Sequence, residues 1–338
     1  MVPLTIGELA VSGLGITAPG VSGPDGALVR MPGAADPGWF QAEPALSGRG
    51  YRRLPRATQY LLTAARRAVD DAGSRWPETS RHRRGAVVAT NNAGAALLEE
   101  LDTTIIRHGA KELSPSLSPY STMSSFASRL SVEHGISGFN LTVNSPATAG
   151  LEAIRIASRA VAAGRASTVL VAAVEEALSA SQSAGRASQA GAAVLCCEPA
   201  ATGAARYGRC SARSAFLDPA AAADGAAVFA RLMGDTPPSR IDAVLEDSAV
   251  GTAAARWLDR LTGDCDVVVV PTAAHAGCLT PLHRVVGLLA QEHATPARRA
   301  VLAASAEGTI ALAELTVTPR PPNGATAGNP LSDRHGGQ

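Results

Sequence analysis

Aromatic side chains are scarce in this sequence, at 4% of its 338 residues. The core must then be filled mainly by alanine, valine, leucine and isoleucine, which suits helices packed closely on a sheet. Long apolar runs are missing as well: no uncharged stretch could span a bilayer, and no basic and then apolar leader opens the chain. We therefore expect a globular protein of the cytoplasm that does not enter a membrane.

An excess of charge of either sign is also absent. The 30 lysine and arginine residues nearly balance the 29 aspartate and glutamate residues, and the formal net charge is +1. This excludes the electrostatic footprint of a nucleic-acid-binding or membrane-surface protein. The five cysteines contain no CxxC pair, and no histidine–cysteine cluster has metal-ligand spacing. The sequence thus predicts buried thiols, with neither a metal site nor a disulfide framework.

The chain does contain a regular alternation of strand-like and helical segments. Residues 56–72 keep one apolar stripe at helical spacing and are followed by Gly73, a common stop signal. Short apolar runs at 86–89, 139–143 and 168–173 predict strands, and helices are predicted from Ala95 onward and over 150–163. Such alternation favours an α/β fold with a largely parallel sheet that is covered on both faces.

Two parts of the chain have similar sequences, as in an internal repeat. Residues 85–89, with Gly94 and Leu101 after them, match residues 242–246, with Gly251 and Leu258 after them, at a constant offset. A second echo relates residues 143–150 to 270–277, and each unit reads as strand, small-residue turn and helix. Chance matching of alanine-rich segments is the alternative, but the shared order of the two pairs favours an internal duplication.

Four motifs, taken in order, resemble the β-ketoacyl synthase family. Residues 11–19 are similar to its opening strand and loop, and residues 56–73 to its first long helix. Residues 140–143 and 150–153 match the strand and helix that flank the family's nucleophile, and residues 165–175 match the next strand. The resemblance covers most of the chain and implies a duplicated thiolase-like fold of class α/β, layered α-β-α-β-α with two mixed sheets. It divides the chain into an N-terminal half at 1–205 and a C-terminal half at 206–318. Residues 319–338 are rich in Pro, Gly, Asn and Ser without periodicity, which predicts a disordered tail.

The resemblance also shows which catalytic residues are missing. Condensing members need two histidines and a cysteine thiolate at a helix N-terminus. The helix dipole and the free backbone N–H groups there lower the pKa of the thiol and hold an oxyanion. The nucleophile position falls here on Ala147, and no cysteine precedes Cys196. The histidine positions fall on Ser248 and Ala274, with His275 one residue away. These four positions, Ala147, Ser248, Ala274 and His275, are thus degenerate, and the resemblance implies that no catalytic residue is present.

Chain length factors of type II polyketide synthases keep this fold without the nucleophile. The resemblance implies that this chain is such a factor, with no cofactor of its own, and that it heterodimerises with an active ketosynthase. Together the two subunits would form a tunnel for the growing chain, whose shape this subunit sets. The chain would be carried on a phosphopantetheinyl acyl carrier protein held by the partner. Its compact length fits a polyene-forming, highly reducing system. Two alternatives stay open: a ketosynthase-fold decarboxylase, acyl-transfer or cyclising enzyme using His275, Ser248 or Thr148, and a homodimeric acyl-chain- or carrier-binding protein. Ser145 and Thr148 are otherwise interpreted as helix-capping residues.

The family comparison also assigns a tunnel helix and a partner surface. Ala95, Leu98 and Asp102 are three and then four residues apart, share one helical face and occupy the tunnel-gating positions, although a simple core helix would show the same spacing. The strand at 139–143 pairs across the dimer axis in the family, and an uncovered apolar edge of this kind is prone to aggregate. The predicted interface residues are Tyr120, Met123, Phe126, Phe139, Asn140, Leu141, Thr142 and Val143.

Overall fold

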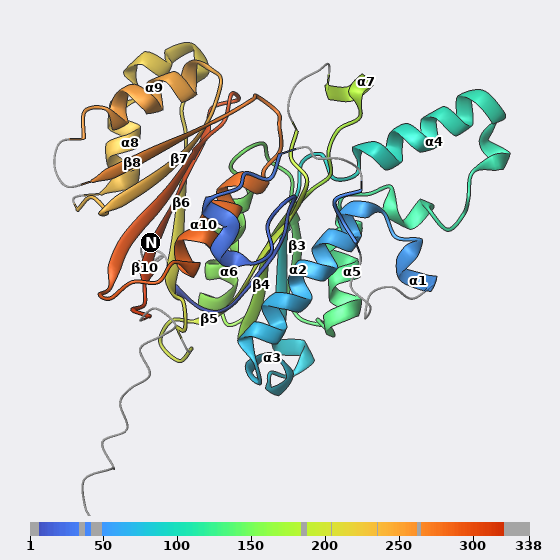
Figure 1. The fold of residues 1–338 in the computed structure, drawn as a ribbon, viewed down its shortest axis with the longest axis horizontal. Helices are drawn as coiled ribbons and strands as arrows, with labels where there is room; N and C mark the ends of the chain where they lie inside the picture. The colour runs from blue at the N-terminus through green and yellow to red at the C-terminus, as the bar shows by residue number, and fades with distance from the viewer. Residues whose placement is uncertain are drawn as a thin grey trace, which may run out of the picture.

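The computed structural model describes residues 7–33, 38–41, 49–183, 188–203, 205–234, 236–261 and 265–320 (Figure 1). Its strands are β1 (Leu9–Thr17), β2 (Arg84–Ala89), β3 (Asn140–Val143), β4 (Thr168–Glu175), β5 (Gly191–Pro199), β6 (Gly208–Phe216), β7 (Arg240–Glu246), β8 (Asp266–Thr272), β9 (Ala297–Ala304) and β10 (Thr309–Val317). Its α-helices are α1 (Arg49–Arg52), α2 (Arg56–Ala72), α3 (Arg75–Glu78), α4 (Ala95–His108), α5 (Ser124–His134), α6 (Ala149–Ala162), α7 (Ala180–Ser183), α8 (Ala226–Met233), α9 (Ala249–Leu258) and α10 (Leu279–Ala290). The short 3₁₀ turns include η1 (Pro24–Leu28) and η6 (Pro219–Asp224).

The helices and strands predicted from periodicity are confirmed. Helix α2 covers the predicted residues and ends at Gly73, whose φ of 67° needs a residue without a Cβ. Strands β2 and β4 contain the predicted apolar runs, and α6 begins one residue before the predicted position. No helix within the described ranges combines the length and the hydropathy that a membrane span requires.

The strand order confirms the internal duplication. The sheet runs β3-β2-β4-β5-β1-β6-β10-β9-β7-β8, so its first five strands are mirrored by its last five. In each half the first three strands are parallel, and the fourth and fifth pair antiparallel to their neighbours. Both halves therefore fold to the same plan, as expected of a duplicated α/β unit.

The sheet register corrects one detail of the repeat. Ala89 pairs with Val143, and Glu246, its counterpart in the second half, pairs with Thr272. The structural counterpart of Val143 is therefore Thr272 and not Val270, two residues later than the sequence echo predicts. The alanine-rich turn offers no bulky side chain to fix the alignment, which is why the sequence comparison slipped.

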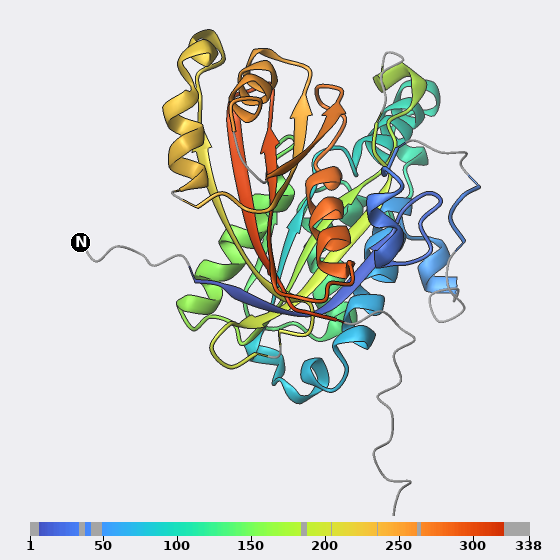
Figure 2. The same cartoon turned by 60° about the vertical axis from the view of Figure 1, so that its left-hand side comes forward.

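The five predicted layers are present. Helices α6 and α10 lie between the two halves of the sheet, where α6 contacts β2 and β4 on one side and β6 and β10 on the other. Helices α2 and α5 cover the outer face of the first half, and α8 and α9 cover that of the second half (Figures 1 and 2). Alternate residues of β4 show this directly, because Val169 and Val171 face the central helices whereas Leu170 and Ala172 face α2 and α5.

The prediction of two separate sheets is wrong in one respect. Strand β1 pairs with β5 along its whole length, and its first three residues, Leu9 to Val11, also pair with β6 between Gly208 and Cys210. The two halves are therefore joined along one short seam into a single ten-stranded sheet. Beyond the seam the halves separate, and α6 and α10 occupy the space between them.

The glycines of the first strand explain its motif. A Cβ added at Gly13 would lie 2.1 Å from the carbonyl oxygen of Ala68, and one at Gly15 would lie 1.9 Å from that of Ala64. Helix α2 therefore packs directly onto the β1 backbone, at a distance that only glycine permits. The Gly-rich run therefore serves close helix–sheet packing.

The two edges of the sheet differ in chemistry. Strand β3 has four residues and pairs only with β2 in the described part of the chain, and it carries no proline. Strand β8, at the other edge, has seven residues and contains Pro271, which has no N–H to donate to a neighbouring strand.

Arg320, which the sequence pattern places in the tail, belongs to the fold. Arg320 donates its backbone N–H to His293 O at 2.9 Å, and its guanidinium lies 4.4 Å from the centroid of the Tyr207 ring. The fold thus continues through Arg320. The rest of the predicted tail, 321–338, lies outside the described residues.

A buried ion pair fixes α10 on the second half, and its removal should destabilise the protein. Asp242 is fully buried; its Oδ2 lies 2.7 Å from Arg284 Nε and its Oδ1 lies 2.7 Å from Arg240 Nε. The substitution Asp242→Asn leaves the buried Arg284 charge without a counter-ion, and we expect unfolding free energy to fall by about 3–5 kcal/mol. The matched control is Asp266→Asn, which removes an exposed carboxylate 3.7 Å from Arg240 and should cost less than about 1 kcal/mol in chemical denaturation. Equal losses in the two variants would contradict this assignment.

Candidate functional site

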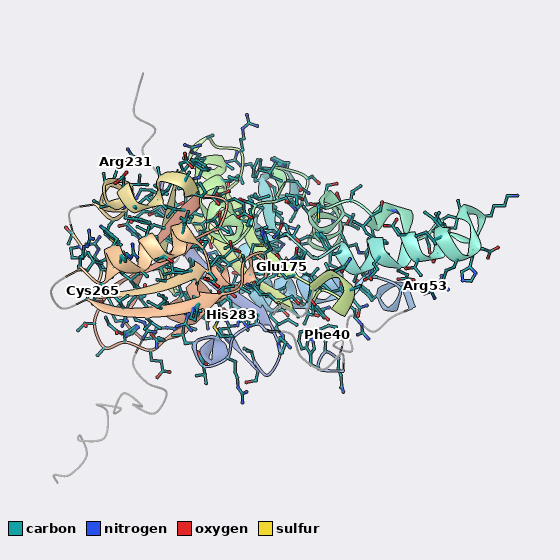
Figure 3. All side chains as sticks on the ribbon, turned by 90° about the horizontal axis from the view of Figure 1, so that it is seen from above. Phe40, Arg53, Glu175, Arg231, Cys265 and His283 are labelled. Atoms are coloured by element: carbon teal, nitrogen blue, oxygen red, sulfur yellow. The ribbon has the colours of Figure 1, made fainter. Side chains whose placement is uncertain are left out.

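The degenerate positions lie among loops that follow the carboxyl ends of the parallel strands. The turn after β2, the segment before α6, the loop before α10 and the loop joining β9 to β10 are linked by hydrogen bonds at this edge. Glu175, at the end of β4, accepts bonds from the backbone N–H groups of Asn91, Asn92 and Cys278, at 2.9, 2.7 and 2.8 Å. Figure 3 shows Glu175 near the middle of the molecule. The structure therefore brings the predicted site together around a buried carboxylate.

Ala147 lies in the turn that leads into α6 and is 1% exposed. Its methyl group offers neither a nucleophile nor a proton. The next residue, Thr148, is buried, and its hydroxyl lies 3.1 Å from Thr309 Oγ1 and 3.3 Å from Glu152 Oε1. Thr148 occupies the N-cap position of α6, yet it makes no side-chain capping bond. The capping role predicted for Thr148 is therefore wrong, because its hydroxyl is turned toward β10.

Ser248 is a structural cap. It begins α9 with an extended backbone, and its Oγ accepts from Gly251 N at 3.0 Å and donates to Glu246 O at 3.2 Å. The residue lies in an open groove of about 450 Å³ with Asp247 and Thr272. No histidine, lysine or arginine lines that groove among the described residues, and the Ser248 hydroxyl is already donated to the Glu246 backbone carbonyl.

Ala274 and His275 lie in the loop between β8 and α10. His275 has a positive φ of 62°, and its imidazole Nδ1 is 3.0 Å from Glu307 Oε1 at the surface. Its backbone N–H donates to Glu246 Oε1 at 3.0 Å, and its carbonyl accepts from the Asn92 side chain at 3.0 Å. The side chain is 55% exposed. The loop is thus tied down by its backbone while the imidazole faces solvent and an acidic neighbour.

Two buried carboxylates at this site were not identified from the sequence. Burial raises the pKa of Glu175 above its ordinary value, and the three backbone N–H donors act against that rise. Burial likewise raises the pKa of Glu246, whose Oε2 accepts from Ala306 N at 2.7 Å. Each carboxylate ends a buried strand and cross-links loops far apart in the sequence. Burial also raises the pKa of the neighbouring Glu176, whose Oε2 accepts from Ala57 N at 3.3 Å.

The predicted tunnel positions lie on α4, which projects from the body of the molecule (Figure 1). Leu98 is 41% exposed and Asp102 is exposed, whereas the neighbouring Leu97 is buried. Leu97 also lines a cavity of about 590 Å³ between α4 and the start of α2, together with Arg53 and Glu176. The face formed by Ala95, Leu98 and Asp102 therefore points outward in the isolated chain and lines no cavity described within it.

The predicted partner surface is placed in part. Leu141, in β3, is 40% exposed, whereas Phe139 and Val143 pack partly against the central core. The side chain of Asn140 donates to Ala127 O at 3.1 Å, and Thr142 is half-buried. Tyr120 and Met123 are also half-buried, and both pack against the core beneath α2. The prediction for Phe126 is wrong: it is 2% exposed and fills that core, because it belongs to the buried stripe of α5.

The positions that the resemblance assigns to the family's catalytic residues hold other side chains in this chain. The head of α6 presents a methyl group, the two histidine positions hold Ser248 and Ala274, and His275 is directed to Glu307. No cluster of histidine, cysteine and acidic side chains suited to a metal ion occurs in the part of the chain that the structure covers. Of the described cysteines, Cys196, Cys197, Cys210 and Cys278 are buried and Cys265 is half-buried, and all are free thiols.

Sequence comparison decides the family. The sequence model described as "Beta-ketoacyl synthase, N-terminal domain" matches residues 20–229, which is more than half of the chain. This chain belongs to the β-ketoacyl synthase family.

Individual relatives of this ketosynthase-family chain are distant. It is 28% identical over 138 residues to 3-oxoacyl-[acyl-carrier-protein] synthase 2 of Vibrio cholerae, in a match covering 41% of this chain and 33% of that protein. It is 28% identical over 199 residues to a putative polyketide beta-ketoacyl synthase 1 of Streptomyces halstedii, covering 51% and 47%. The chain thus spans between a third and a half of the length of these relatives.

Solved structures of the family match nearly the whole chain. The structure titled "The ishigamide ketosynthase/chain length factor" has a TM-score of 0.68 at 19% identity, over 92% of this chain and 99% of that chain. A type II polyketide synthase acyl-carrier protein in complex with its ketosynthase bound to the hexaketide has a TM-score of 0.70 at 14% identity, over 93% and 100%. These matches confirm the predicted thiolase-like fold of this ketosynthase-family chain.

Proposed function

We propose that this chain is a non-catalytic chain length factor, which pairs with an active ketosynthase and shapes the tunnel for its polyketide chain. The observation that carries the proposal is Ala147, a buried alanine at the head of the central helix, where a condensing enzyme of the family needs its thiolate. A methyl group there cannot hold an acyl chain. The family fold is nevertheless present over 92% of the chain, which fits a role that does not depend on the nucleophile.

Two elements of the chain, helix α4 and the edge strand β3, carry exposed apolar side chains. Leu98, Ile105 and Ile106 of α4 are 41, 43 and 83% exposed, and Leu141 of the β3 edge is 40% exposed. Large apolar side chains exposed on a protruding helix and on a sheet edge are typical of interaction surfaces. An active ketosynthase that adds its own edge strand to β3 would cover them, and the match to a ketosynthase/chain length factor structure supports this partner.

The growing chain would be delivered from outside this polypeptide. In the proposed complex the ketosynthase partner receives it from a phosphopantetheinyl acyl carrier protein, and this chain needs no cofactor of its own. A solved complex of an acyl-carrier protein with its type II ketosynthase, similar in fold to this chain, supports that arrangement. The outward face of α4, with Ala95, Leu98 and Asp102, would become a tunnel wall once the partner covers it. A polyene-forming, highly reducing system stays a prediction.

Co-expression with a ketosynthase tests the proposal. Native mass spectrometry should detect a 1:1 complex, and malonyl- or acyl-loaded carrier protein should leave no covalent acyl mass on this chain. Acylation of the partner's cysteine in the same sample is the positive control. An acyl adduct on this chain by itself, or malonyl turnover that His275→Ala abolishes, would establish the enzymatic alternative. A homodimer that co-purifies with carrier protein and does not bind the ketosynthase would establish the homodimeric carrier-binding alternative.

A further inference from the structure

A small pocket lined by arginines lies where α6, β6 and α8 meet. It has a volume of about 340 Å³, and its lining includes Arg155 and Arg159 of α6, Arg213 of β6 and Arg231 of α8. None of its lining residues is acidic. Figure 3 shows Arg231 at the end of the molecule away from Arg53 and α4, so the pocket is separate from the proposed partner surface.

The charge in this pocket is largely uncompensated. Arg213 is paired with Glu314 of β10, which also lies 3.7 Å from Arg298. Among the described residues, the guanidinium groups of Arg155, Arg159 and Arg231 make no ion pair or hydrogen bond, and the Nε of Arg155 is both shielded from water and without a partner. A buried donor left without an acceptor costs free energy, and like charges in one pocket repel, so an anion would be stabilised here.

An exposed aromatic ring borders the same pocket. Phe216 ends β6 and is 63% exposed, an unusual placement in a chain with few aromatic residues. One part of its ring lies against Gly308, where an added Cβ would come within 2.9 Å of Phe216 Cε2. The ring is therefore held in place by the loop beneath it while much of its surface stays open, which suits stacking on a planar group.

We propose that this pocket binds a nucleoside diphosphate, with the arginines holding the phosphates and Phe216 stacking on the base. Guanidinium groups bind phosphate oxygens in a bidentate manner and remain charged at any physiological pH. A pocket of about 340 Å³ is within the range of small-ligand sites, roughly 300–1,000 Å³. Arg155 lies six residues beyond Ala149, the first residue of α6, and so about 9 Å along the helix axis from the turn that contains Ala147. The pocket is therefore distinct from the degenerate site.

Isothermal titration calorimetry with three probes tests this site on the full chain, in its complex with a ketosynthase where the chain is not soluble alone. ADP should bind saturably, pyrophosphate should bind more weakly, and adenosine should show no measurable binding. Added salt should weaken the binding of both anions, because the contacts are ionic. Arg231→Gln and Arg155→Gln should each raise the dissociation constant for ADP at least tenfold. Phe216→Ala should weaken the binding of ADP and leave the affinity for pyrophosphate unchanged.

The matched control is Arg165→Gln, an exposed arginine just beyond the end of α6 that does not line the pocket. It should leave ADP binding unchanged. The inference is overturned if neither ADP nor pyrophosphate binds at concentrations up to about 1 mM, a free energy of only about 4 kcal/mol. It is equally overturned if binding occurs with the same affinity in the Arg231→Gln and Arg155→Gln variants.

Discussion

Replacing Leu141 with arginine should abolish the complex with a ketosynthase partner, raising its dissociation constant at least a hundredfold. Leu141 lies within the four-residue edge strand β3 and is 40% exposed in the isolated chain. In the proposed complex this edge is covered, so the substitution would place an unpaired charge in an apolar contact. A hundredfold change corresponds to about 2.7 kcal/mol, well within the cost of burying an unpaired charge at an interface. Native mass spectrometry or affinity co-purification measures the loss.

The two edges of the sheet provide the control for this experiment. Val269 lies on β8, at the opposite edge, and is 47% exposed, so Val269→Arg changes the same chemistry at a comparable exposure. This variant should keep the complex at wild-type affinity. Loss of the complex in both variants would indicate general misfolding, and an intact complex in Leu141→Arg would place the interface elsewhere.

Acidification should weaken the fold through a buried histidine. His283 of α10 is fully buried, and neither of its ring nitrogens has a hydrogen-bond partner among the described residues. Burial, together with the neighbouring Arg284 charge, lowers the pKa of His283 to about 3. The imidazole is therefore neutral in the folded chain and takes up a proton on unfolding below about pH 6.5. Its contribution to stability is present above that pH and is lost as the pH falls toward 3.

The substitution His283→Leu removes this dependence. A pH of 4.5 lies about two units below the ordinary pKa of an imidazole, which His283 regains on unfolding. Protonation therefore favours the unfolded state of the wild type by about 2.7 kcal/mol at this pH. The difference in unfolding free energy between variant and wild type should shift by about that amount, in favour of the variant, between pH 7.5 and pH 4.5. Urea denaturation at the two pH values measures it.

Taking a difference between two proteins isolates the histidine. The buried carboxylates Glu175 and Glu246, whose pKa values burial raises, are common to both chains and cancel. His134→Leu should act in the same direction, since burial lowers the pKa of His134 to about 4. An unchanged difference between pH 7.5 and pH 4.5 would show that the His283 imidazole is not desolvated as the structure indicates.

Most of the fold could be predicted from the sequence because its signals are local. The apolar stripe of α2 and the short apolar runs of β2 and β4 specify their own structure through periodicity. The seam between β1 and β6 has no such signal, since the three residues that form it are ordinary strand residues whose second partner lies about two hundred positions away. The two sheets were consequently predicted as separate.

The site was predicted less completely, for a similar reason. The missing nucleophile at Ala147 is visible in one residue, whereas Glu175 acquires its role from backbone N–H groups of three distant loop residues. The family comparison, and no local pattern, places Phe126 on the partner surface. Its spacing to Leu130 in α5, four residues on, is the helical signal that would have assigned both to the core.

Pro271 makes the two edges of the duplicated sheet unequal as sites for adding a strand. A protein built from two copies of one folding unit has two related rims, and if each could recruit a further strand, protomers would join end to end into an open filament. Strand β8 interrupts that series with a residue that cannot donate a hydrogen bond, while β3 has none. The β8 edge therefore offers one donor fewer to an added strand than it otherwise would, which favours pairing through β3 over end-to-end assembly.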